Sequence, residues 1–297
     1  MGPAMAQHAD FFRKRMNVGP LWEAGLDGAS CRVAVVDSGI NPNGVLGNPP
    51  VWNEDYTGEG ITHDRTGHGT KVATCIRQIA AQCELMNARA TPTPPAPATK
   101  EAAARAVRAA AAAGADIVNL SLDFEPGGCD PSARRYFDTS VHPQMLLERW
   151  APDPARACVL CLASWDVAQM GVAVVVAAGN QWGKPSGCPG RSPGVLVAEA
   201  TALRSEWDQV WNRKSRLVRW WEWKVRGNVA RDWGTSFSAG YASGLVALLM
   251  PYVQDLGWMA AKPQFEAAGA DGSMTVDGTV VLERLRNMVE GPEENDE

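Results

Sequence analysis

Short apolar runs separated by helix-forming segments dominate the pattern of this chain. Cys31 to Val36 is continuous and rich in β-branched residues, as expected of a strand buried on both faces of a sheet. Further strands are predicted at residues 84–89, 116–122, 172–178 and 195–198. Helical spacing or composition marks residues 68–81, 100–113, 144–150, 155–169 and 236–250, the last ended by Pro251. Strands that alternate with helices predict an α/β fold in three layers, with a mostly parallel central sheet and helices on both faces.

The stretches between these elements indicate how the chain is organised. We expect an N-terminal extension over residues 1–20, one large domain over residues 21–285 and an acidic tail over residues 286–297. A short helix is predicted near Leu21. Residues 41–60 are rich in Gly, Pro and Asn and are predicted to be a loop. Residues 129–154 are interpreted as an insertion, and residues 203–230 form a Trp/Arg-rich segment.

Composition and charge exclude several classes of protein. The chain has 297 residues, of which 45% are hydrophobic and 21% are charged, as in an ordinary globular protein. Its 28 basic and 33 acidic residues leave a net charge of -5, so no uniformly basic field attracts nucleic acid. The longest apolar runs contain seven residues, whereas a membrane-spanning helix needs about 20. We therefore expect no membrane partner.

The N-terminus and the cysteines bear on the location of the protein. Arg13, Lys14 and Arg15 are not followed by an apolar segment, so a secretory signal is not expected. The seven cysteines are an odd number and are interpreted as reduced thiols in a cytoplasmic protein. Cys158 and Cys161 form a CxxC motif, but no second pair at zinc-finger spacing accompanies it. Buried thiols are therefore preferred over a redox pair.

Four short segments contain the candidate chemistry. They are Val35-Val36-Asp37-Ser38-Gly39, Gly67-His68-Gly69-Thr70, Ala177-Ala178-Gly179-Asn180 and Gly234-Thr235-Ser236. A serine hydroxyl becomes a good nucleophile only when an imidazole accepts its proton, and a buried carboxylate must hold that imidazole in one tautomer. Asp37, His68 and Ser236 supply these groups. Asn180 and the backbone N–H of Ser236 supply donors for the oxyanion of a tetrahedral intermediate.

The order Asp37, His68, Ser236 resembles that of the subtilisin-like serine proteases, the subtilases of peptidase family S8. The resemblance runs from about Leu21 to about Met250 and includes Asn180 as the oxyanion residue. It implies a subtilisin-like fold and serine endopeptidase activity without a required cofactor. The catalytic pattern begins almost at once, which leaves about 20 residues for any propeptide.

The resemblance also implies where a substrate lies, and this chain departs from the family there. Ser121-Leu122 and Ala177-Ala178-Gly179 would flank the pocket for the residue before the scissile bond. The family usually continues with Gly-Gly, whereas this chain has Asp123-Phe124-Glu125. Two carboxylates at the pocket mouth would favour Arg or Lys in the substrate. Alternatively, Asp123 turns outward into the loop and the pocket accepts an apolar side chain.

No metal site is expected. His63, Asp64 and His68 could suggest one, but two of them fall in a polar loop and the triad explains His68 better. Several subtilases bind calcium in surface loops, for which Asp55, Glu59 and Asp64 are candidate ligands, but their spacing is not diagnostic.

The Trp/Arg-rich segment leaves three interpretations open. It contains Trp207, Trp211, Trp220, Trp221 and Trp223 among six basic residues. These residues form a surface hairpin or helix whose indoles cover the core, or a docking surface for a protein or peptide partner, or, least favoured, a nucleic-acid surface.

The sequence thus predicts a serine endopeptidase that acts through an Asp-His-Ser triad and an acyl-enzyme on a peptide or protein substrate. We expect a dedicated intracellular processing protease. The alternative is a non-catalytic peptide- or protein-binding module built on the same scaffold.

Overall fold

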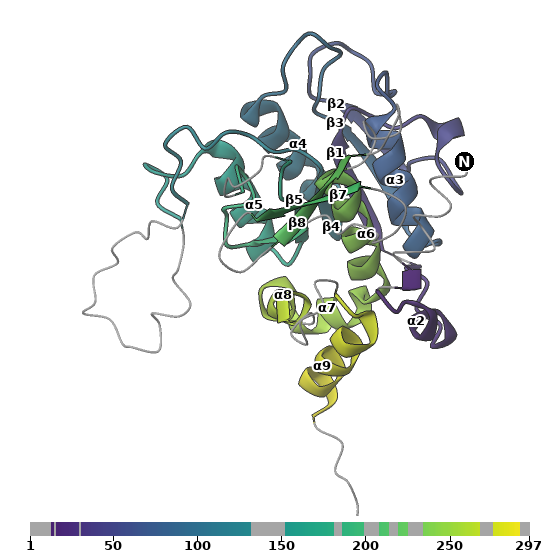
Figure 1. Cartoon of the computed structure of the whole chain (residues 1–297). Coiled ribbons are helices and arrows are strands. Elements are labelled where there is room, and N and C mark those ends of the chain that lie inside the picture. Colours follow the sequence, from purple (N-terminus) through teal and green to yellow (C-terminus); the bar gives the residue numbers. More distant parts are fainter. Residues whose placement is uncertain are drawn as a thin grey trace, which may run out of the picture.

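The computed structural model describes residues 13–14, 16–29, 31–131, 152–180, 186–198, 208–213, 219–224, 234–267 and 276–291, with the backbone alone for 208–213 and 219–224. Its centre is a sheet of six parallel strands in the order β2-β3-β1-β4-β5-β6 (Figure 1). The strands are β1 (Arg32–Asp37), β2 (Trp52–Asp55), β3 (Glu84–Arg89), β4 (Ile117–Leu120), β5 (Ala173–Ala177) and β6 (Val195–Ala198). The predicted α/β class with a parallel sheet is confirmed.

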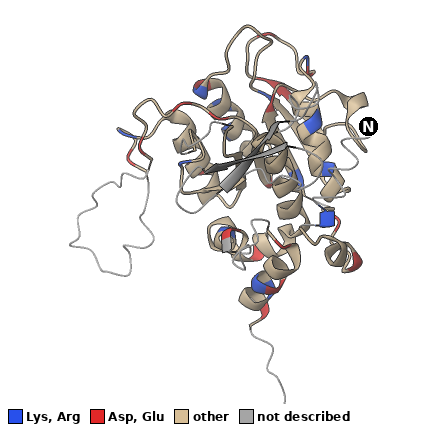
Figure 2. Ribbon diagram, viewed as in Figure 1, with Lys and Arg blue, Asp and Glu red and all other residues tan. Residues whose placement is uncertain are grey.

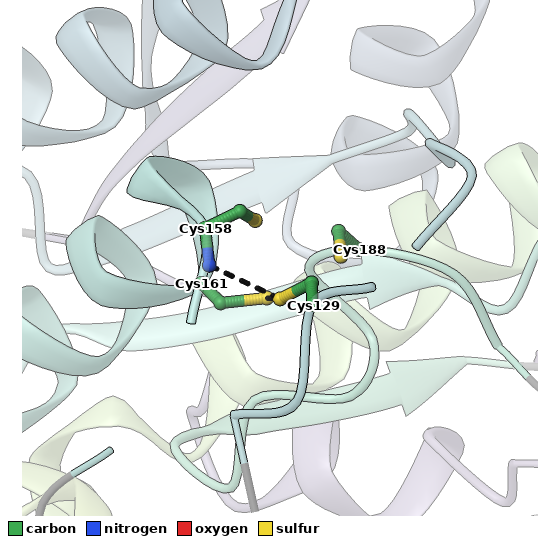
Figure 3. Close-up of side chains that lie close together, drawn as sticks. All are labelled: Cys129, Cys158, Cys161 and Cys188. Carbon is green, nitrogen blue, oxygen red and sulfur yellow. Dashed lines mark hydrogen bonds between the residues drawn. The ribbon is translucent and has the colours of Figure 1, made fainter. Parts of the chain in front are cut away.

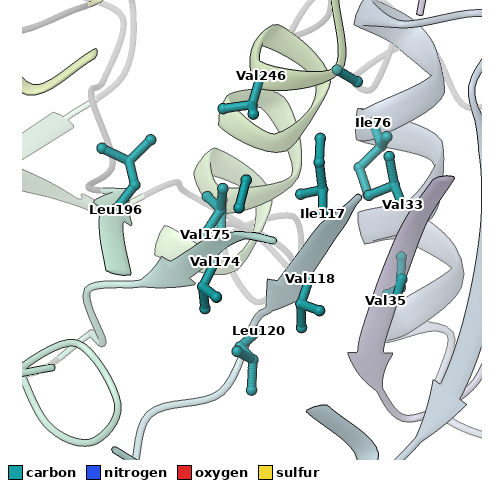
Figure 4. Packing of buried hydrophobic residues seen from close by; sticks show 14 of the residues in the cluster. Val33, Val35, Ile76, Ile117, Val118, Leu120, Val174, Val175, Leu196 and Val246 are labelled. Atoms are coloured by element: carbon teal, nitrogen blue, oxygen red, sulfur yellow. The ribbon is translucent and has the colours of Figure 1, made fainter. Parts of the chain in front are cut away.

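Two helices cover each face of the sheet. Helices α3 (His68–Ile79) and α6 (Thr235–Leu248) pack together on one face, and α4 (Lys100–Ala112) and α5 (Val159–Gln169) pack together on the other (Figure 1). Alternate residues of β4 face the two layers. Ile117 points toward α6, whereas Val118 and Leu120 point to the opposite side (Figure 4). This double burial explains why the central strands are largely apolar in sequence.

The remaining helices lie at one end of the molecule. They are α2 (Gly19–Glu23), α7 (Met250–Leu256), α8 (Trp258–Ala267) and α9 (Gly278–Glu290), with a short 3-10 turn η1 (Pro42–Gly44) elsewhere. None of the described helices is both long and apolar enough to cross a membrane by itself; α6 and α7 pass that test only when joined, and they meet at 73°.

Three details of the predicted elements differ from the structure. Strand β2 lies inside the stretch predicted to be a loop, because an edge strand with the polar sequence Trp-Asn-Glu-Asp shows no apolar pattern. Helix α5 begins at Val159 rather than at 155, since residues 153–157 form a turn. Pro251 does end α6, but it also lies in the first turn of α7, where its missing N–H costs nothing.

The ends of the domain also differ from the expected boundaries. Met16 and Val18, placed in the N-terminal extension, are buried in the core, and the Met16 carbonyl accepts the N–H of Gly278 at 2.7 Å. Helix α9 continues through position 286, where the acidic tail was expected to start. The helix predicted over 144–150 and most of the predicted insertion lie outside the described residues.

The Trp/Arg-rich segment contains a second, two-stranded sheet. Strands β7 (Asp208–Arg213) and β8 (Arg219–Lys224) pair in antiparallel fashion, with Trp211 opposite Trp221. The rest of the segment lies outside the described residues. Elsewhere in the described chain, basic and acidic residues are interspersed (Figure 2).

Candidate active site

A buried carboxylate and an imidazole form the centre of the site. Asp37 ends β1 and His68 begins α3, and Asp37 Oδ1 lies 2.7 Å from His68 Nδ1. The Asp37 side chain is 1% exposed. A carboxylate only accepts, so Nδ1 carries the proton and Nε2 keeps its lone pair. The Asp37 charge raises the pKa of His68 above its ordinary value, although burial of the ring opposes this.

The chain brings these two groups together through a close approach of backbone. A Cβ at Gly69 would lie 2.3 Å from the Gly39 carbonyl oxygen and 3.0 Å from Asp37 Cβ. Only glycine therefore allows the first turn of α3 to lie against the end of β1, which explains the glycine after His68.

A second buried carboxylate, considered from the sequence only as a metal ligand, holds the start of α3. Asp64 is 4% exposed and accepts hydrogen bonds from the backbone N–H groups of Thr66, Gly67 and Thr70 and from the hydroxyls of Ser38 and Thr70. Burial alone would raise the pKa of Asp64, but these hydrogen bonds together lower it. Asp64 thus fixes the loop that positions His68.

Ser236 lies in the first turn of α6, whose next residue contacts the imidazole. The ring of Phe237, the next residue, packs against His68 with 5.7 Å between the centroids. The Ser236 hydroxyl is 3.3 Å from the Ser121 carbonyl oxygen and donates to it, and the Ser121 hydroxyl lies 3.0 Å from the Ser236 carbonyl oxygen. These two hydrogen bonds between Ser121 and Ser236 join the end of β4 to the start of α6.

Asn180 follows β5 and is held by the residue before Ser236. Its Oδ1 accepts the backbone N–H of Thr235 at 3.1 Å and lies 3.2 Å from the Thr235 hydroxyl. A backbone N–H can only donate, so this contact assigns the oxygen and leaves Nδ2 as the outer donor. A Cβ on Gly234 would lie 2.9 Å from Nδ2, which explains why glycine lies there.

The predicted substrate-binding residues lie on the two central strand ends. Ser121 and Leu122 follow β4, and Ala177, Ala178 and Gly179 end β5 and lead to Asn180. Because β4 and β5 are neighbours, these two segments end at the same edge of the sheet. The Gly179 N–H donates to the Thr235 hydroxyl at 3.1 Å.

Asp123 is turned toward a neighbouring loop. Its Oδ1 accepts the N–H of Gly187 at 2.9 Å. The next residue, Phe124, exchanges two backbone hydrogen bonds with Cys188, at 2.8 and 3.0 Å. One oxygen of the Asp123 carboxylate is therefore bonded to the loop, which favours the alternative of an apolar pocket over a cationic one.

The three acidic residues considered for calcium have other partners. Arg89, at the end of β3, is 1% exposed and its guanidinium contacts Asp55 at 3.1 Å and Glu59 at 2.7 Å. Both carboxylate oxygens of Asp64 accept the hydrogen bonds described above. Asp55 and Glu59 neutralise a buried cation, and Asp64 caps a loop.

The described residues contain one cluster with metal-ligating side chains, which the sequence analysis did not foresee. Cys129, Cys158, Cys161 and Cys188 bring their sulfur atoms within 4.8 Å of one another. Only the CxxC pair could be recognised from spacing, since the other two cysteines are distant in sequence.

A buried Asp paired with a half-buried His, close to the helix turn that contains a serine, is consistent with the arrangement of a serine hydrolase. A model of the subtilase family matches residues 28–264, which is most of the chain. The chain therefore belongs to the subtilase family and is a serine-type endopeptidase, as its sequence predicted.

Solved structures share the fold at low sequence identity. MycP1 without its propeptide is 20% identical, with a TM-score of 0.58 and coverage of 91% of this chain and 96% of that one. MycP3 of a type VII secretion system is 23% identical, with a TM-score of 0.58 and coverage of 91% and 87%. The prenylagaramide maturation protease PagA is 19% identical, with a TM-score of 0.58 and coverage of 90% and 98%. Curated protein sequences gave no match.

Proposed function

We propose that this subtilase cleaves peptide bonds by an acyl-enzyme mechanism in which Ser236 is the nucleophile, His68 the general base and Asp37 the residue that orients the imidazole. The observation that carries this assignment is the 2.7 Å contact between Asp37 and His68 beside the first turn of α6. It leaves Nε2 as the basic atom.

The chemistry follows from this arrangement. The Ser236 hydroxyl turns from the Ser121 carbonyl toward Nε2, transfers its proton there and attacks the substrate carbonyl. The imidazolium is stabilised by the Asp37 carboxylate and then protonates the leaving amine. Water, activated by the neutral imidazole, hydrolyses the acyl-enzyme.

The negative charge on the tetrahedral intermediate needs donors that are already in place. Nδ2 of Asn180 and the backbone N–H of Ser236 supply them, and Thr235 holds the amide in this orientation. Ser236 also lies at the N-terminus of α6, where the helix dipole favours negative charge.

Labelling by a fluorophosphonate probe tests the assignment, because such a probe reacts only with an activated serine. We expect one adduct on Ser236, located by peptide mass spectrometry, and its loss in Ser236→Ala. Ser238→Ala removes a buried hydroxyl from the same helix and should be labelled like the wild type. If Ser236 stays unlabelled while a peptide still binds, the protein is a binding module.

We further propose that the enzyme processes a dedicated peptide or protein precursor inside the cell. None of the seven cysteines is joined in a disulfide, which suits a reducing compartment. Among proteins of the same fold, PagA is a maturation protease. Cleavage-site profiling of a whole proteome with the purified enzyme tests this role: a narrow set of sites supports it, whereas general degradation contradicts it.

A further inference from the structure

Four cysteines from three separate segments converge next to the substrate edge of the sheet. Cys158 and Cys161 come from the start of α5, and Cys129 and Cys188 come from two loops (Figure 3). All four sulfur atoms lie within 4.8 Å of one another, and those of Cys129 and Cys161 are 3.8 Å apart. We propose that these residues form a structural zinc site in which all four ligands are cysteine thiolates.

The distances fit one tetrahedral ion. Zinc binds thiolate sulfur at about 2.3 Å, and a regular tetrahedron with that bond length places its corners about 3.8 Å apart. This spacing is the one observed between Cys129 and Cys161. A disulfide needs sulfur atoms about 2.05 Å apart. An iron–sulfur cluster contains several atoms between the thiolates and would hold them farther apart than a single ion does.

The surroundings suit thiolates. The backbone N–H of Cys158 donates to Cys129 Sγ at 3.1 Å, a contact that stabilises negative charge on sulfur (Figure 3). Arg191 donates to the Cys129 carbonyl at 2.8 Å, so a cation lies near a site whose net charge with zinc would be negative.

Ordinary packing explains the cluster less well. Cys129, Cys161, Cys188 and Ala157 form a small buried group apart from the main core. The half-buried Cys158, Phe124 and Leu162 pack against this group, and Cys158 and Phe124 also contact the main core. Such a small group buries little aliphatic surface with which to hold two loops in place. One metal ion that joins the three segments would supply the missing stability.

The position of the site suggests what it supports. Cys188 shares two backbone hydrogen bonds with Phe124, and Asp123 binds the neighbouring Gly187. Cys129 follows the same strand end after the turn at Pro126. The zinc would therefore hold the segment after β4 against α5 and the loop around Cys188.

Metal analysis of the whole protein tests the proposal without reference to activity. Protein produced in zinc-supplemented medium should contain about one zinc ion per chain, as measured by elemental (inductively coupled plasma) mass spectrometry. Cys129→Ser and Cys188→Ser should lower the content at least about tenfold, whereas Cys83→Ser, a buried cysteine outside the cluster, should keep it. Wild type with less than a tenth of an equivalent of zinc overturns the proposal, as does an iron–sulfur chromophore.

Three measurements on the wild type remain decisive if the variants fail to fold. Cobalt substituted for zinc should show the absorption of tetrahedral thiolate coordination, and a strong chelator should lower Tm by about 5 °C or more. In denaturant without reductant, all seven thiols should react with a thiol reagent. If four of them are oxidised as disulfides, or if cobalt gives an octahedral spectrum, the site is not the one proposed.

Discussion

The backbone N–H of Thr235 donates to Oδ1 of Asn180 at 3.1 Å, so the residue before Ser236 aligns the amide of Asn180. The oxygen of that amide is used by the protein itself, and Nδ2 remains for a substrate. This contact joins the end of β5 to the start of α6, the two elements that would hold an oxyanion between them.

Asn180→Ala should therefore lower kcat by about 100- to 1000-fold with KM little changed, because one oxyanion donor is lost in the transition state only. Steady-state kinetics on a peptide substrate measures both constants. Thr235→Val, which removes a hydroxyl but keeps the backbone N–H, should have a smaller effect. A higher KM with an unchanged kcat for Asn180→Ala would place this residue in substrate binding instead.

Activity should rise with pH through the titration of His68. The base works only when it is neutral, and the Asp37 carboxylate raises its pKa. The acid limb of kcat/KM should thus lie to the alkaline side of about 6.5, the ordinary value for histidine. A pH profile that stays flat from about 5 to about 9 would contradict a histidine base.

Asp37→Asn tests whether the Asp37 carboxylate is what raises the pKa of His68. The variant should lose about 1000- to 10,000-fold in kcat, because the imidazole is no longer held in the required tautomer. Its residual activity should show a limb at lower pH than that of the wild type, since the charge that raised the His68 pKa is gone. If the acid limb of the variant lies at the same pH as that of the wild type, a group other than His68 is responsible for it.

Asp64→Asn should reduce the free energy of unfolding by about 3 kcal/mol, because a buried carboxylate that accepts several hydrogen bonds is replaced by an amide that cannot accept them all. Denaturant unfolding measures this. Asp166→Asn is the control: that carboxylate is 53% exposed in its pair with Arg108, and its loss should cost less than about 1 kcal/mol.

The same residue makes stability depend on pH. The folded pKa of Asp64 is lowered, so its contribution is present above the unfolded value of about 3.9 and is lost as pH falls through the folded value. The wild type should lose more stability than Asp64→Asn on acidification below about pH 4. Equal losses would show that other carboxylates dominate.

Substrate preference before the cleaved bond should follow the hydrogen bond of Asp123 to Gly187. Because one carboxylate oxygen is occupied there, we expect a peptide library to show apolar residues at least as good as Arg or Lys, with the same ranking for Asp123→Asn. A strong preference for basic residues that disappears in Asp123→Asn would instead support a pocket that binds Arg or Lys through the Asp123 carboxylate.

Local sequence patterns predicted most of the central strands and the proposed catalytic residues. The largely apolar strands β1, β4 and β5 could be recognised because burial on both faces leaves few polar positions. Asp37, His68 and Ser236 could be named because each lies in a short glycine-containing segment, and their order along the chain matches a known family. Strand β2 could not, since an edge strand needs only a partner for its backbone and has no apolar signature.

The sequence by itself determined the layered α/β fold, its family and the residues proposed for catalysis, because these depend on periodicity and on residues close along the chain. Only the tertiary structure decided the partners of polar groups. Arg89 neutralises Asp55 and Glu59, Asp123 binds Gly187, and Cys129 and Cys188 meet the CxxC pair of α5. Which side chains meet across large separations depends on how the loops return over the sheet, and no local pattern encodes that path.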